Sequence, residues 1–387
     1  MIKSIQLLVL ASLFLLGCGG ESREESIQEN DEFEVVDDIQ NDKQDYGADD
    51  GIADIYIEIE AIDSLWASGT QNVISSWNEQ ILIPTLTGLL RFTLDKNGYI
   101  DQHELLPEFL FNIIQVQDNV IAAHNFNHIE FYAYDGDNLS LIEKTPDEAL
   151  KQTALAHNKN CFYWLVTAEQ QTSLSSVKQA CIEDDGIIIN TIIMREDYID
   201  NVYAFSDDHL AIFSTPIDDA SKNSKLTIYK KHGSHYETVS DVETGESWWP
   251  LDIDSFEGNI YAPVKPTDQP DSDGSGGLVK FEISDSSIEK IVKISDLVTD
   301  NTGYDIIAQT PAGLMLGNDK KLIHFIIEEG KVVRRVTAEI ENSISSIYIH
   351  GDYVVVVLRN PPSSYSTGED GPQGVHIYPY QNFIQQE

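Results

Sequence analysis

The segment NIIQVQDNVIAAHNFNHIEFYAY, residues 112–134, decides the fold class. It contains three short apolar runs, at 112–115, 119–122 and 129–134, separated by turns rich in Asp and Asn. Runs of this length that are bounded by turn residues are typical of β-strands, and none of them has the spacing of an amphipathic helix. The segment is therefore predicted to form three antiparallel strands.

This pattern recurs along the chain, and a fourth, weaker strand closes each unit. The first strand is expected at 72–75, 112–115, 153–156, 201–204, 250–253, 305–308 and 346–349. The second is plainest at 81–83, 119–122, 209–213 and 353–358, and the third at 89–94, 129–134, 225–229, 278–283, 322–327 and 374–380. Seven units that begin 40 to 55 residues apart match the period of a β-propeller with four strands per blade. A pair of β-sandwiches or a solenoid fits this count and order less well.

The two ends of the pattern predict how the ring closes. The last unit has three strands and stops near Tyr380, while a spare alternating segment, Ile55 to Glu60, precedes the first unit. Pairing of that segment with the last blade would leave no terminal edge exposed. We therefore expect an N-terminal strand to complete the seventh blade.

Residues 52–387 thus resemble seven-bladed β-propellers of the broad WD40-like and LVIVD-like type. The resemblance is one of pattern, since the chain has no Trp-Asp blade ending and no Gly-His dipeptide at the start of a repeat. It also lacks the Gly-Lys-x-x-Trp-like signature of the outer-membrane assembly propeller lipoprotein.

The pattern of the N-terminal residues predicts a targeting segment. Lys3 is followed by an apolar run from Ile5 to Leu16, which is too short to span a bilayer and is typical of a secretory signal. The ending Leu15-Leu16-Gly17-Cys18 resembles the lipobox of bacterial lipoproteins. That resemblance implies a signal peptide at 1–17 and lipidation of Cys18 on its sulfur and its new amino terminus; the alternative is an ordinary signal peptide with a chance cysteine.

A tether is expected between the lipid and the propeller. Residues 21–50 contain thirteen acidic residues against two basic ones, and such a segment buries too little apolar surface to fold. Residues 18–51 are therefore assigned as a lipidated, disordered acidic linker. Gly19 stands where inner-membrane lipoproteins of many Gram-negative bacteria carry Asp, which by analogy favours the outer membrane and leaves the periplasmic or surface side open.

The net charge of −41 bears on possible partners. A chain this acidic is repelled by nucleic acids and by anionic lipid surfaces, so neither is expected as a ligand. The expected partners are the membrane, through the lipid anchor, and another envelope or extracellular protein.

Cys161 and Cys181 flank a predicted hairpin centred near Gln171. An exported protein meets an oxidising compartment, so a cross-strand disulfide between them is expected, with two free buried thiols as the alternative. The nearby His157 adds too little for a zinc site.

Binding is expected in three long polar loops, at 216–224, 263–277 and 361–374, because such loops on one face of a rigid ring usually carry recognition. In the second loop, Asp268, Asp271 and Asp273 precede a Gly-rich turn and resemble part of a calcium loop. The full calcium pattern with its closing Glu is absent, which favours an acidic turn.

Trp248 and Trp249 form the most unusual local string. Paired Trp side chains can stack on a sugar, and they can equally pack between blades. The pairs His124/His128 and His232/His235 have no accompanying carboxylate ligand pattern and are expected as surface loop residues. No nucleophile elbow or phosphate loop occurs, so no catalytic residue, metal or other cofactor is assigned.

These observations favour a non-enzymatic, lipid-anchored propeller that binds or scaffolds a protein or envelope component. Two alternatives stay open. One is an enzyme of the lactonase or lyase type with its site at the central tunnel, and the other is an envelope assembly factor. The fold alone does not choose among them.

Overall fold

The structure is a computed structural model, and contacts divide the chain into two units, Met1–Asp45 and Tyr46–Glu387. All described residues belong to the second unit, and the predicted signal peptide and linker, residues 1–51, lie outside the described residues. The described residues are 52–65, 74–85, 87–167, 174–183, 186–215, 224–244, 248–250, 252–266, 277–295, 306–318, 320–359 and 374–384.

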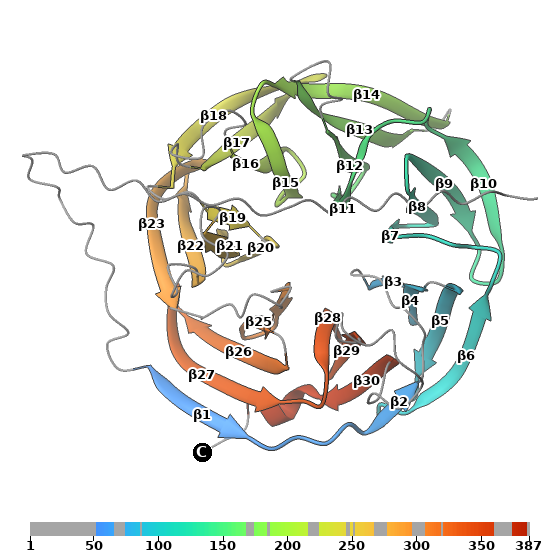
Figure 1. Cartoon of the computed structure of the whole chain (residues 1–387), viewed down its shortest axis with the longest axis vertical. Helices are drawn as coiled ribbons and strands as arrows, with labels where there is room; N and C mark the ends of the chain where they lie inside the picture. Colours follow the sequence, from blue (N-terminus) through green and yellow to red (C-terminus); the bar gives the residue numbers. More distant parts are fainter. Residues whose placement is uncertain are drawn as a thin grey trace, which may run out of the picture. The chain divides into compact units, whose positions relative to one another are not determined.

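The second unit is a seven-bladed β-propeller, which confirms the predicted fold (Figure 1). Each blade is a sheet whose first strand lies towards the centre of the ring and whose last strand lies at the rim. Blades 1 to 3 consist of β3 (Ser75–Trp77), β4 (Gln80–Thr85), β5 (Gly88–Leu94) and β6 (Ile100–Leu106); β7 (Ile113–Gln117), β8 (Val120–Asn125), β9 (His128–Tyr134) and β10 (Leu139–Lys144); and β11 (Leu150–His157), β12 (Cys161–Val166), β13 (Ser175–Glu183) and β14 (Gly186–Arg195).

The remaining blades follow the same order. Blades 4 and 5 consist of β15 (Tyr198–Ala204), β16 (His209–Thr215), β17 (Lys225–His232) and β18 (His235–Glu243); and β19 (Trp248–Pro250), β20 (Asp254–Phe256), β21 (Asn259–Pro266), β22 (Gly277–Ser284) and β23 (Ser287–Ser295). Blade 6 contains β24 (Ile306–Thr310), β25 (Gly313–Asn318), β26 (Lys321–Glu328) and β27 (Lys331–Glu339), and blade 7 contains β28 (Ser343–His350), β29 (Tyr353–Arg359) and β30 (Gly374–Pro379). Of the strand expected at 250–253, only Pro250 lies in a strand, β19; the next strand, β20, begins at Asp254, and both β19 and β20 pair with β21.

An N-terminal strand closes blade 7, as predicted, but it is a different segment from the one expected. The strand that pairs with β30 is β2 (Asp63–Leu65), whereas β1 (Ala53–Ile57) runs parallel to β27 on the rim of blade 6 (Figure 1). The expectation that Ile55 to Glu60 completes blade 7 is therefore wrong. Both β27 and β30 offered an unpaired edge, and the N-terminal segment covers the two edges in succession.

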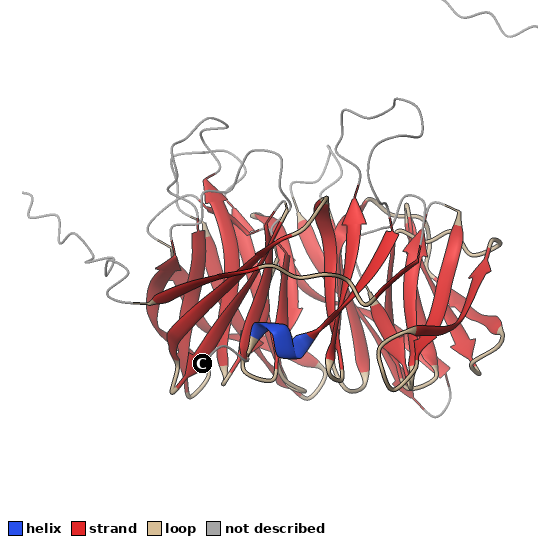
Figure 2. Ribbon diagram, turned by 90° about the horizontal axis from the view of Figure 1, so that it is seen from below, coloured by secondary structure: helices blue, strands red, loops and turns tan. Residues whose placement is uncertain are grey.

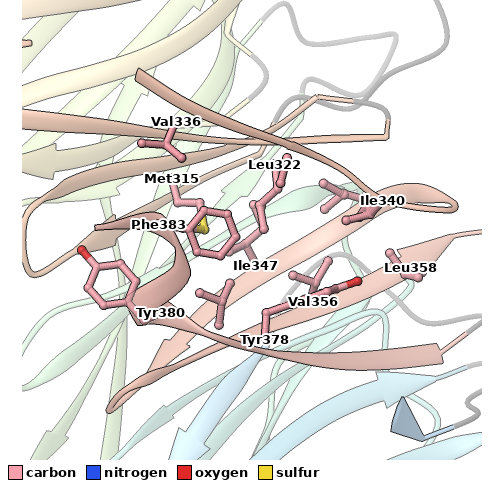
Figure 3. Close-up of a cluster of buried hydrophobic side chains, with 13 residues drawn as sticks. Met315, Leu322, Val336, Ile340, Ile347, Val356, Leu358, Tyr378, Tyr380 and Phe383 are labelled. Carbon is pink, nitrogen blue, oxygen red and sulfur yellow. The ribbon is translucent and has the colours of Figure 1, made fainter. Parts of the chain in front are cut away.

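The core lies between the blades, because each central strand buries both of its faces. In β8, Ile121 and Ala123 pack towards blade 1, while Ala122 packs with Phe162 and Trp164 of blade 3. This two-sided burial explains why the second strand of each unit is almost continuously apolar. The cluster between blades 6 and 7 also takes in Tyr380 and Phe383 of the short 3-10 helix η1 (Tyr380–Phe383), which follows β30 (Figure 3).

A disulfide joins Cys161 to Cys181 in blade 3. The two residues are direct partners in the register of β12 with β13, and their Cα atoms lie 4.1 Å apart. The register thus places the centre of the hairpin at residue 171, as the sequence indicated.

Candidate binding face

The two faces of the ring are built from different connections (Figure 2). First-to-second and third-to-fourth strand connections lie on one face and are short: β20 leads to β21, and β22 leads to β23, across two residues each. We call this the tight-turn face. Second-to-third strand connections lie on the other face, and they include the three long loops predicted as binding segments, between β16 and β17, β21 and β22, and β29 and β30. We call this the long-connection face; most residues of those loops lie outside the described part of the chain.

Phe126 is an exposed aromatic residue on the long-connection face. It forms the tip of the β8–β9 turn, where the N–H of Asn127 donates to the carbonyl of Asn125 at 2.6 Å. Phe126 has a φ of 47°, and 64% of its surface is exposed. A left-handed conformation costs a non-glycine residue about 1 kcal/mol, and here the side chain recovers little of that cost by burial.

Leu110, on the β6–β7 connection, is a second exposed apolar residue of the long-connection face. The N–H of Asn112 donates to the carbonyl of His124 at 2.9 Å, which continues the β7–β8 pairing by one residue towards both positions. Leu110 is 50% exposed. Glu108 is an exposed acid on the same β6–β7 connection as Leu110, and Asp147 is an exposed acid on the β10–β11 connection, so acidic residues accompany the apolar ones on this face.

A polar cluster in blade 2 supports this turn. His128 Nε2 lies 3.0 Å from Glu130 Oε1, and its Nδ1 lies 3.3 Å from Asp147 Oδ1. Burial acts to raise the pKa of Glu130, but hydrogen bonds from Tyr132 and His128 outweigh it and hold that pKa below its ordinary value. Glu130 therefore stays ionised and can fix His128 at the base of the turn.

The expectation that His124 and His128 are surface loop residues is wrong, because both belong to strands and are buried. Burial lowers the pKa of His124 to about 4, so its ring is neutral. Neither of its ring nitrogens has a hydrogen-bond partner among the described residues. His232 and His235, by contrast, are exposed on the β17–β18 hairpin, as expected.

An ion pair lies between blades 3 and 4 at the same face. Lys151 Nζ is 3.4 Å from Asp200 Oδ1, and the two side chains are 12% and 4% exposed. Burial lowers the pKa of Lys151 and raises that of Asp200, while their mutual attraction opposes both shifts. Lys151 also lies 4.7 Å from the centre of the Tyr198 ring, and Thr215 donates its hydroxyl proton to Asp200. The pair therefore holds the ends of two blades together at the binding face.

Two carboxylates of blade 5 reach across to the inner strand of blade 6. Asp252 accepts hydrogen bonds from the N–H groups of Ile253 at 2.9 Å and Ile307 at 3.1 Å. Asp254 accepts from the N–H of Gln309 at 2.7 Å and from the hydroxyl of Tyr203 at 2.8 Å. Both carboxylates accept hydrogen bonds from backbone N–H groups at the unpaired edge of β24, the inner strand of blade 6. Asp252 and Asp254 therefore serve to hold blades 5 and 6 together.

A shallow pocket of about 130 Å³ lies at the tight-turn face between blades 1 and 2. Its cation, Arg91, donates from Nε to Glu104 Oε2 at 3.0 Å and from Nη1 to the carbonyl of Gly136. Because these acceptors belong to β6 and to the β9–β10 turn, Arg91 joins the two blades.

The other predicted site residues have the following positions. Cys18, Asp268, Asp271 and Asp273 lie outside the described residues, so lipidation and the calcium loop stay predictions. Trp248 and Trp249 are residues of β19, paired with Pro266 and Lys265. Within the described ranges, no group of three or more His, Cys, Asp or Glu side chains could hold a metal ion.

The described part of the chain contains no helix with the length and apolarity needed to cross a membrane.

Sequence reasoning missed Phe126 and the Lys151–Asp200 pair. A bulky aromatic residue inside an Asn-Phe-Asn turn was the signal available for Phe126. The ion pair joins residues 49 positions apart on different blades and had no local signal.

Comparison with known proteins identifies the fold. No known protein family matches the chain, and no curated protein matches it in sequence. The extracellular domain of a B. thetaiotaomicron protein described as a hybrid two-component system has a TM-score of 0.51 and 12% identity, over 82% of this chain and 39% of that one. The N-terminal domain of Nup159 has a TM-score of 0.51 and 9% identity, over 84% of this chain and 98% of that one. The computationally designed protein Ika8 has a TM-score of 0.52 and 11% identity, over 83% of this chain and 99% of that one.

The chain thus spans well under half the length of the first of these proteins. At such identities, the likeness establishes the propeller fold alone.

Proposed function

We propose that this protein is a lipid-anchored binding module whose long-connection face recognises another protein of the cell envelope. The observation that carries the proposal is Phe126, an exposed aromatic residue held at the tip of a strained turn on that face. A side chain that gains nothing from the fold in such a position is best explained by a gain in a complex.

The surroundings of Phe126 support a partner of particular chemistry. Phe126 and Leu110 would supply an apolar centre, and Glu108 and Asp147 would supply an acidic border. An apolar core with a charged rim is the usual arrangement of a protein interface. The complementary surface would carry an apolar side chain flanked by Lys or Arg.

The rigid blades beneath the face suit recognition. The Lys151–Asp200 pair and the His128 cluster fix the strand ends from which the connections leave. Preorganised strand ends reduce the entropy lost when a partner binds. An enzyme at the central tunnel is less well supported, because Asp252 and Asp254 are used in bonds between blades.

The partner can be tested in living cells by placing a photo-crosslinking amino acid at position 126. The matched control is position 99, since Tyr99 is 50% exposed and lies on the tight-turn face. We expect position 126 to crosslink an envelope protein through a segment rich in Lys or Arg, and position 99 to give none of that product. Equal yields at both positions, or crosslinks from 126 to acidic segments or to no protein, would refute the proposal.

Phe126→Asn separates binding from folding. Asn tolerates left-handed φ, so the variant should be at least as stable as the wild type. Loss of the aromatic anchor should weaken partner binding by about tenfold or more, which corresponds to more than about 1.4 kcal/mol. Unchanged affinity in this variant would show that Phe126 is not part of the interface.

The anchor is tested separately by metabolic labelling with a fatty acid. The wild-type chain should incorporate the label and fractionate with the outer membrane, and Cys18→Ala should do neither. Labelling that persists in Cys18→Ala would exclude the proposed anchor and leave the binding face untouched.

A further inference from the structure

Three side chains at the tight-turn face, between blades 4 and 5, form a relay of hydrogen bonds. Ser286 Oγ lies 2.7 Å from His209 Nε2, and His209 Nδ1 lies 2.6 Å from Asp208 Oδ1. Asp208 precedes β16, His209 is its first residue, and Ser286 sits in the two-residue β22–β23 turn. The separation of 77 residues between His209 and Ser286 explains why no sequence motif announced the cluster.

The order of these groups is that of an activated serine nucleophile. A carboxylate at Nδ1 holds the imidazole in the tautomer whose Nε2 lacks a proton and can accept one from a hydroxyl. Burial acts to raise the pKa of Asp208, but hydrogen bonds from Ser206 and His209 outweigh it and hold that pKa below its ordinary value. The carboxylate is therefore ionised, as this role requires.

The backbone at Ser286 is strained. Asp285 and Ser286 have φ values of 49° and 67°, so two successive non-glycine residues adopt the left-handed conformation. Turns of this type usually contain Asn and Gly, and a strained conformation is often retained where it positions a reactive side chain. Here the turn directs the Ser286 hydroxyl to His209, on the neighbouring blade.

A substrate could reach this site. The side chains of His209 and Asp208 are 12% and 50% exposed, and Ser286 is partly exposed. The Phe205 ring, 5.5 Å from the imidazole, offers an apolar wall. The β22–β23 pairing ends at Ser284 and Ser287, so the backbone N–H of Ser286, in the turn, takes no part in that pairing.

The geometry points to an esterase site in which Ser286 is the nucleophile, His209 the general base and acid, and Asp208 a positioning residue. The substrate class is small carboxylic esters, because the site is open and lies at the surface. This activity goes beyond the proposed binding function and uses the opposite face of the ring.

The reaction has two steps. Ser286 Oγ attacks the acyl carbon while its proton moves to His209 Nε2 and the carbonyl electron pair moves onto oxygen. Collapse of this intermediate restores the carbonyl and breaks the bond to the alcohol, which leaves with the proton from His209. Water then attacks the acyl-serine and gives a proton to His209, and Ser286 departs with that proton, so ester and water yield acid and alcohol.

The test uses the full chain purified in detergent, a fluorophosphonate probe and p-nitrophenyl acetate. We expect the probe to label Ser286, as identified by mass spectrometry of the modified peptide, and the ester to be hydrolysed with turnover. Ser286→Gly should abolish both signals while it relieves the turn, so its thermal midpoint should not fall. His209→Asn should lower both rates by about 100-fold or more.

The matched control is Ser284→Ala, which removes an exposed hydroxyl from the same hairpin and should keep the wild-type rates. Asp208→Asn should lower kcat and leave KM unchanged, which a purely structural role would not produce. An unlabelled wild-type chain beside a labelled standard serine hydrolase, labelling that survives Ser286→Gly, or equal losses in Ser284→Ala would each overturn the assignment.

Discussion

Asp252→Asn tests the contact between blades 5 and 6. The two oxygens of Asp252 accept the N–H groups of Ile253 and Ile307. Burial raises the pKa of Asp252 to about 7, against the opposing effect of these two hydrogen bonds and with a small addition from the charge of Asp254. The folded protein therefore holds a proton on Asp252 at pH values where the unfolded chain, with an aspartate pKa of about 3.9, has lost it.

The higher pKa of Asp252 in the folded state decides how the stability of the protein changes with pH. Between pH 4 and 7 the folded state binds more protons at this site, so the free energy of unfolding falls as pH rises. The contribution of Asp252 is fully present below about pH 4 and is lost as pH rises to 7. Each unit of pKa difference is worth about 1.4 kcal/mol, so the whole change is on the order of 4 kcal/mol.

Asn has no such dependence, but it offers one oxygen to two N–H groups. Leaving one donor unpaired costs about 1 to 3 kcal/mol at every pH. We therefore expect the wild type to be the more stable protein at pH 5, and its advantage over Asp252→Asn to shrink or reverse at pH 8.

The assay is urea or thermal unfolding of both proteins at pH 5, 6, 7 and 8, with Asp101→Asn as an exposed control. Asp95 and Asp135, whose pKa values are lowered by backbone hydrogen bonds, give the opposite pH dependence. They are common to all the proteins and cancel in the difference. A difference between wild type and Asp252→Asn that stays constant from pH 5 to 8 would refute the reasoning.

Three further predictions concern the fold. Replacing both Cys161 and Cys181 by Ser should lower the free energy of unfolding by about 3 kcal/mol, because it reopens a loop of 20 residues, and reduction of the wild type should reproduce the loss in urea unfolding. Gly313→Ala should lower the thermal midpoint far more than Gly351→Ala: a Cβ at 313 would lie 2.1 Å from a backbone oxygen, whereas at 351 it would meet nothing within 4 Å. A chain from which every residue up to Leu65 is removed loses β2, the outer strand of blade 7. Hydrogen exchange of the backbone amides in β30 should then accelerate, while exchange in β13 stays slow.

Local patterns were enough to predict most of the fold. The run from Ile129 to Tyr134 predicted β9, and the recurrence of similar runs predicted seven blades. Successive side chains of a strand point to opposite faces, so burial leaves a local pattern in the sequence, and each blade repeats that pattern. The disulfide was also predictable, since a hairpin centred on Gln171 brings Cys161 opposite Cys181.

The closing strand was only partly predictable. Ile55 to Glu60 alternates well and does supply a strand, β1, but the closing strand β2 is three residues long and has no clear alternation. Two rim edges were available to the N-terminal segment, and a linear pattern carries no information about which edge lies within reach.

The sequence by itself determined the number of blades and the order of the strands within them, because both depend on residues that are neighbours along the chain. Only the tertiary structure decided which side chains meet across blades: Ser286 with His209, Lys151 with Asp200, and Asp252 with the N–H of Ile307. The physical reason is that these contacts depend on the distances between packed sheets. Those distances are set by the bulk of every side chain buried between them, and no spacing within the sequence records them.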